Sequence, residues 1–170
     1  MATLPAIQQP ELRAYPCYDR LPRGCVMFPV ADDAAWPIFR PGEVVVIDPR
    51  QRDPIHGELF VIEYGKGSND PRRGLVETFL RAGRYGKATP DGYSLAEFEE
   101  TSCWHTGAYN RPRSAEEGMQ WLRAGRRGSF VDGPVGQDAR GLAYMRQRLV
   151  GRVIGILQPK FDETRLRKVN

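Results

Sequence analysis

The sequence has few of the residues that build disulfide frameworks or metal centres. Its 170 residues include three cysteines and two histidines. An odd number of widely spaced cysteines argues against a disulfide framework and favours a reducing compartment, so we expect a cytoplasmic location. Cys103 and His105 could join Cys17, Cys25 or His56 in a site, but their spacing matches no zinc motif. We therefore expect no metal and no other cofactor.

Long apolar runs are also missing. No window approaches the ~18 consecutive apolar residues that indicate a transmembrane helix, so we expect no membrane partner. The opening residues, MATLPAIQQPELRAYP, lack the basic and apolar regions of a signal peptide. Lysine is scarce too, because arginine supplies 21 of the 25 basic residues, and the net charge is +4. This small surplus fits either a mixed solvated surface or a nucleic-acid-binding face.

Glycine and proline, in contrast, are abundant. The chain has 18 glycines and 14 prolines, which favours turns and short strands over long helices. The clearest strand contains the β-branched run Val44 to Ile47. The sequence therefore predicts a mainly β protein, with strands over residues 25–30, 42–50, 56–65, 74–83 and 148–159.

Residues 87–98 allow two interpretations. Asp91 and Gly92 form a hairpin signal, so residues 93–98 could return as a strand against residues 75–82. Ser94 with Glu97 also fits a capping box, which would begin a helix. We prefer the strand.

One helix is predicted late in the chain. In residues 114–125, Ser114 and Glu117 form a capping box, and a glycine ends the apolar pattern. We expect a loop over residues 101–113 before this helix, and a loop or short strand over residues 126–141 after it.

The stretch DDAAWPIFRPGEVVVIDPR carries a family pattern. Asp33 is followed by Pro37, then by the pair Gly42-Glu43, then by an apolar strand that ends in Asp48. This order resembles the motif G-D-S-M-x-P, G-D and strand-ending Asp of LexA/UmuD-type serine peptidase domains. These domains include the C-terminal domains of phage repressors and are related to signal peptidases. The leading glycine of the motif is Asp32 here.

Later segments extend the resemblance over residues 26–82 and 146–158. RDPIHGELFVI is similar to the next Gly-acid step of the family, and LVGRVIGIL is similar to its closing strand. The resemblance implies a LexA-like compact domain of curled antiparallel sheets. We expect an N-terminal arm over 1–25, a single domain over 26–160, and a charged tail over 161–170. Residues 83–145 exceed what the family needs and are interpreted as an elaborated, helix-containing insertion.

The resemblance also shows that both reacting groups of the family are replaced. The family uses a serine nucleophile and a lysine that burial keeps neutral as the general base. Ala34 stands at the serine position, and Glu77 or Thr78, depending on register, stands at the lysine position. Lys66 and Lys87 lie on flanking loops, where we interpret them as solvated surface residues. The cleft of such a fold would be lined by Asp33, Ala35, Trp36 and Pro37.

These features predict a pseudoenzyme. We expect a catalytically inactive, phage repressor-like protein, acting in transcription regulation or a stress response, that forms a homodimer and holds a regulatory protein or peptide in the cleft. Two alternatives stay open. One is an active self-cleaving or signal-peptidase-like hydrolase whose serine was substituted at Ala34. The other is a nucleic-acid-binding accessory protein that uses an arginine-rich surface, formed by Arg123, Arg126, Arg127, Arg140, Arg146, Arg148 and Arg152.

Overall fold

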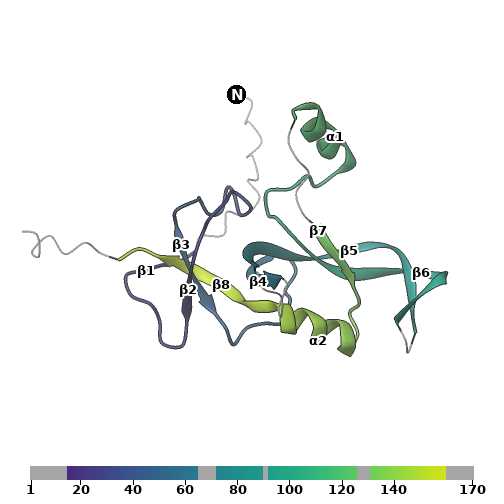
Figure 1. Cartoon of the computed structure of the whole chain (residues 1–170), viewed down its shortest axis with the longest axis horizontal. Helices are drawn as coiled ribbons and strands as arrows, with labels where there is room; N and C mark the ends of the chain where they lie inside the picture. Colours follow the sequence, from purple (N-terminus) through teal and green to yellow (C-terminus); the bar gives the residue numbers. More distant parts are fainter. Residues whose placement is uncertain (1–14, 65–71, 90–91, 126–130, 160–170) are drawn as a thin grey trace, which may run out of the picture.

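The chain folds around one large sheet. The computed structural model describes residues 15–64, 72–89, 92–125 and 131–159 (Figure 1). The elements are β1 (Cys17–Tyr18), β2 (Val26–Pro29), β3 (Val44–Asp48), β4 (Glu58–Tyr64), β5 (Arg72–Thr89), β6 (Gly92–Gly107), α1 (Ala115–Arg123), β7 (Val131–Val135), α2 (Ala139–Arg148) and β8 (Leu149–Leu157). The expected mainly β class is confirmed.

The strands form a single eight-stranded sheet in the order β2-β3-β8-β4-β5-β6-β7. Neighbours along this order are antiparallel, whereas β1 pairs in parallel with the end of β8. The closing strand β8 lies between β3 and β4, so the last strand of the chain joins two of its earliest ones. None of the helices in the described ranges is long and apolar enough to cross a membrane.

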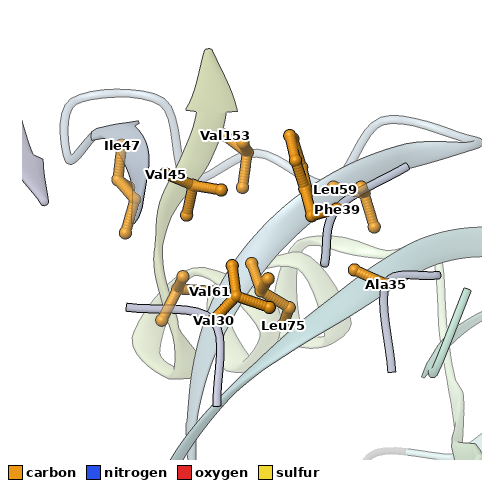
Figure 2. Packing of buried hydrophobic residues seen from close by; sticks show 9 residues of the cluster. All are labelled: Val30, Ala35, Phe39, Val45, Ile47, Leu59, Val61, Leu75 and Val153. Atoms are coloured by element: carbon orange, nitrogen blue, oxygen red, sulfur yellow. The ribbon is translucent and has the colours of Figure 1, made fainter. Parts of the chain in front are cut away.

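The main core lies on one face of this sheet. Val45, Leu59, Val61 and Phe39 are fully buried there, together with further apolar side chains that Figure 2 shows converging from several strands. Alternate residues of a strand point to opposite faces, so these side chains share one face while their neighbours point to the other. Each fully buried side chain of this size contributes about 1.5–3 kcal/mol of hydrophobic free energy.

A second core lies on the opposite face, under α2. Phe60, Ile62 and Val76 pack there against Met145 and Leu149. The sequence did not indicate α2, and the prediction of a single helix was wrong. Only Gly141 and Met145 of this helix are buried. It therefore has too few apolar residues to give a clear helical period, although Asp138 caps its N-terminus through a hydrogen bond from the Gly141 N–H.

β5 and β6 form a long hairpin that extends away from the core (Figure 1). The preferred strand over 93–98 is confirmed, and the Ser94 Oγ accepts a hydrogen bond from the Glu97 N–H within it. Its expected pairing with 75–82 was wrong, because Tyr93 and Phe98 pair with Ala88 and Gly86 nearer the tip of the hairpin. The expected loop over 101–113 was partly wrong, because residues 101–107 complete β6. Polar residues there are buried by tertiary packing, as Thr106 illustrates.

Helix α1 agrees with its prediction. The Ser114 Oγ accepts a hydrogen bond from the Glu117 N–H, and Gly125 takes a positive φ of 69° just beyond the helix. None of the residues of α1 is buried, and it stands apart from the sheet in Figure 1.

The described part of the predicted arm, residues 15–25, lies on the body. The Pro16 and Tyr18 carbonyls accept hydrogen bonds from the Ile156 and Gln158 N–H groups, at 3.0 and 2.8 Å. A Cβ at Gly155 would collide with the Pro16 carbonyl and the Tyr18 ring, so a glycine is needed for this docking. The predicted charged tail over 161–170 lies outside the described residues.

Candidate functional site around Ala34 and Glu77

The segment between β2 and β3 forms a compact turn around Ala34. The Asp32 carboxylate accepts a hydrogen bond from the Ala34 N–H at 3.0 Å, and the Asp33 carbonyl accepts one from the Trp36 N–H at 2.9 Å. Short aspartate side chains commonly close turns in this way. The result is that Ala34 is held, partly exposed, at the tip of the turn.

Two apolar side chains fix this turn to the main core. Ala35 and Phe39 are buried in the cluster of Figure 2, and the Phe39 N–H donates to the Ala35 carbonyl at 3.1 Å. Trp36 points the other way, with 45% of its surface exposed and Arg40 over its ring. Of the predicted lining residues, Asp33, Trp36 and Pro37 are therefore exposed, and Ala35 is a core residue.

Glu77 lies on β5 at the edge of the same core. Its Cα partner on β4 is Leu59, and Leu75 precedes it by two residues. Both belong to the cluster that contains Ala35, so strand alternation places Glu77 on the face of the Ala34 turn. Thr78 points to the opposite face, and its hydroxyl donates to the Ile55 carbonyl. Between the two register options, Glu77 is the residue that faces the turn.

Two arginines hold the Glu77 carboxylate. Its Oε2 accepts hydrogen bonds from Arg111 Nη1 at 2.5 Å and from Arg113 Nη1 at 2.8 Å. The Arg111 side chain is only 6% exposed, and its guanidinium lies 3.8 Å from the centre of the Phe79 ring. Burial lowers the pKa of Arg111, and the charge of Glu77 opposes that shift. The carboxylate is thus neutralised in a largely buried setting.

The same loop also contacts the turn. Asn110 donates its N–H to the Ala34 carbonyl at 3.0 Å, and the next residue, Arg111, binds Glu77. Ala34 and Glu77 are therefore tied together through two consecutive residues of one loop. In chemical terms, Ala34 offers a methyl group and Glu77 an ion-paired carboxylate, and neither supplies the hydroxyl or the neutral amine that a Ser-Lys acyl transfer uses.

Beside this cluster, the first half of β5 has one side with which no described strand pairs, and we call this side its open edge. The Thr78 carbonyl and the Leu80 N–H point toward the β4 side, where they bind the Gly57 N–H and the His56 Nδ1. Since peptide groups alternate along a strand, Arg73 and Leu75 direct their N–H and C=O groups to the other side. The β6 ladder ends at Gly107, opposite Glu77, and no described strand pairs with Arg73 or Leu75 there.

The structure distributes the described arginines of the predicted surface over three elements, α1, α2 and β8. Arg123 lies on α1, whereas Arg146 and Arg148 lie on α2. Arg148 is tucked between the rings of Tyr64 and Tyr144 and pairs with Asp132. Arg140 lines a cavity between β7 and α2 with Tyr144. Arg152 lies on β8, and Arg126 and Arg127 lie outside the described residues.

Cys103 and His105 both lie on β6. Within the described ranges, no group of three His, Cys, Asp or Glu side chains is arranged to hold a metal ion. His105 stacks on Phe79, with ring centres 5.6 Å apart. Burial lowers the pKa of His105 and raises that of the Cys103 thiol.

Sequence reasoning missed Arg111 and Arg113. Both are distant from Glu77 in the chain, and their only local signal is two arginines around a proline just before a helix cap. A search for buried counter-charges to Glu77 could have suggested them. Comparison of the chain with family models, curated proteins and solved structures found no match.

Proposed function

We propose that this protein is a non-hydrolytic binding module related to LexA/UmuD-type peptidase domains, which acts in regulation as a cytoplasmic homodimer. The observation that carries the proposal is the ion cluster in which Arg111 and Arg113 hold Glu77 beside the Ala34 turn. A single loss, such as an Ala34 substitution alone, would leave a lysine at this position. The cluster is instead a complete, packed replacement of the base.

The cluster explains why no peptidase chemistry is expected. Ala34 has no oxygen to activate, and the bound Oε2 of Glu77 accepts two charged hydrogen bonds. Withdrawing a proton from a substrate would require this carboxylate to exchange those bonds for a weaker one. The module would therefore bind a peptide without cleaving it.

The open edge of β5 is the surface that supports peptide binding. Arg73 is exposed and offers outward peptide groups with which an extended chain could pair by strand addition, whereas the neighbouring Leu75 is buried. The outer sheet edges are poorer choices, because β2 contains Pro29 and β7 contains Pro134, and proline has no N–H to offer a partner strand. Strand addition at β5 would also place the bound peptide next to Ala34.

Dimerisation is the second part of the proposal. The family pairs through its closing-strand region, but β8 here is flanked by β3 on one side and by β4 and β1 on the other. A dimer would therefore use side chains of this region, or would displace β1 from Ile156 and Leu157. Sedimentation analysis of the wild type and of Gly155→Val, which blocks β1 docking, distinguishes these routes.

Peptide selection tests the binding function. Peptides of twelve residues selected from a phage-displayed random library should shift the amide resonances of Arg73 and Leu75, and mass spectrometry should find them intact afterwards. Arg73→Pro removes one outward N–H and spares the β4 ladder, so it should weaken binding at least about tenfold. Arg73→Ala is the matched control and should retain binding. Cleaved peptides, or binders that leave these amides unchanged, would contradict the proposal.

A further inference from the structure

A groove lined by arginines lies on another part of the molecule. It has a volume of 570 Å³ and lies between the turn after β3 and α2. It is distinct from the Ala34 site, so this inference is independent of the function proposed there. Arg50 and Arg52 line it from the turn, and Arg146 and Gln147 line it from the helix. Of the described arginines in the surface predicted from sequence, Arg146 alone lines it.

Each of these guanidinium groups is oriented by an internal acceptor. Arg50 donates from Nε and Nη2 to the Asp48 carboxylate, at 2.8 and 3.0 Å, and Arg52 donates from Nε to the Pro49 carbonyl at 3.0 Å. Arg146 donates from Nε to Asp53. A guanidinium has five N–H donors, so each group keeps donors for a ligand.

A fourth arginine adds charge beside the groove. Arg152 is the Cα partner of Asp48 in the β3–β8 ladder, and its N–H donates to the Gln51 carbonyl of the turn. Its Nε is buried and has no hydrogen-bond partner in the described part of the chain. Arg50 and Arg146 pair with the carboxylates of Asp48 and Asp53, whereas Arg52 and Arg152 have no such carboxylate partner among the described contacts, which leaves the region net positive.

We propose that this groove binds the phosphodiester backbone of a nucleic acid. Forked guanidinium groups match phosphate oxygens in geometry, and groups that are already oriented lose little entropy on binding. The lining contains no aromatic ring and only Pro49 and Ala143 as apolar residues. It therefore lacks the apolar anchors on which protein interfaces depend, and it has no platform on which bases could stack. Binding would be independent of sequence.

Fluorescence anisotropy with a labelled 20-base-pair duplex tests this proposal. Affinity for the wild type should fall as salt rises from 50 to 200 mM. Arg52→Gln and Arg146→Gln should each weaken binding roughly tenfold at 50 mM salt and reduce the slope of log K against log salt by about 1. Asp53→Asn should strengthen binding, because it removes a carboxylate that competes with phosphate.

Controls separate a site from a diffuse charge effect. Arg123→Gln removes the same charge from α1, which lies far from α2 in Figure 1, and should change affinity less than twofold. Arg52 and Arg146 are exposed, so Arg52→Gln and Arg146→Gln should leave the midpoint of thermal unfolding unchanged. Equal losses for Arg123→Gln and Arg146→Gln would overturn the proposal. Displacement of the duplex by polyglutamate at equal charge would also overturn it and would indicate an acidic protein partner. An absence of binding at 50 mM salt would overturn it as well.

Discussion

The part of the chain that resembles a peptidase domain and the insertion within it are held together differently. All nine residues of the main core cluster lie outside residues 83–145. The insertion adds Trp104 and Met145 to the second cluster, but α1 buries nothing, and Phe98 is 51% exposed. The insertion meets the main core through the partly buried Tyr109 and through the hydrogen bonds of Arg111 and Arg113 to Glu77. The difference teaches that the main core is built mostly outside residues 83–145, whereas these residues supply the two arginines that bind Glu77.

The largest expected effect is a difference between the two parts in how much a substitution lowers the free energy of unfolding. Phe39→Ala removes a fully buried ring and should lower the free energy of unfolding by about 4 kcal/mol. Phe98→Ala removes an equal ring from the insertion and should cost less than about 0.5 kcal/mol. Denaturant unfolding of both variants measures the difference. Equal losses would mean that the insertion is a full part of the core.

The next effect concerns the contact between the two parts. Glu77→Gln leaves the buried Arg111 without its charged partner and should destabilise the fold by about 3 kcal/mol. Glu63→Gln is the matched control, because its partner Arg73 is more than half exposed, and it should cost less than about 1 kcal/mol. Denaturant unfolding of the two variants should give the lower midpoint for Glu77→Gln. A lower midpoint for Glu63→Gln would contradict the importance of the cluster.

A smaller effect comes from pH. Burial lowers the pKa of His105 on the insertion. As the pH falls, this histidine therefore takes up a proton in the unfolded chain before it does so in the folded chain, and the free energy of unfolding should fall below about pH 6.5. The hydrogen bond from Arg50 lowers the pKa of Asp48 in the core to about 2. Its contribution is present above the unfolded value of 3.8 and is lost between 3.8 and about 2.

Unfolding midpoints measured from pH 8 to pH 2 should therefore fall in two steps. His105→Gln should flatten the first step and leave the second unchanged. A first step that persists without His105 would show that another group causes it.

The smallest effect is confined to α1. Ser114→Ala removes the N-cap hydrogen bond and should destabilise this helix by about 1 kcal/mol. Because none of its residues is buried, the midpoint of global unfolding should not move. Hydrogen exchange of the α1 amides should accelerate about fivefold, while the amides of β3 keep their protection. Faster exchange in β3 as well would show that α1 supports the core.

The elements with strong local signals were predictable from sequence. The run Val44 to Ile47 gave β3 because four β-branched residues favour a buried strand, and Ser114 with Glu117 gave α1. α2 was missed because two buried residues leave almost no period to detect. The end of β6 was missed because polar side chains such as Thr106 become buried only through pairing with distant strands.

The candidate site was predictable only in part. The motif order drew attention to Ala34 and to Glu77 or Thr78, and the register of β5 then separated the last two. Arg111 and Arg113 could not be assigned, because their pairing with Glu77 depends on how the loop after β6 turns back onto the core. The groove of Arg50, Arg52 and Arg146 likewise joins segments that only the folded chain brings together.

The most direct measurement asks whether restoring the hydroxyl restores cleavage. Wild type, Ala34→Ser and the control Ala34→Gly are incubated at pH 10, where a neutral amine is favoured, and their intact masses are followed over days. The account predicts that all three chains keep their full mass, because Glu77 in its arginine pair cannot serve as the missing base. Fragments that arise from Ala34→Ser alone would contradict it.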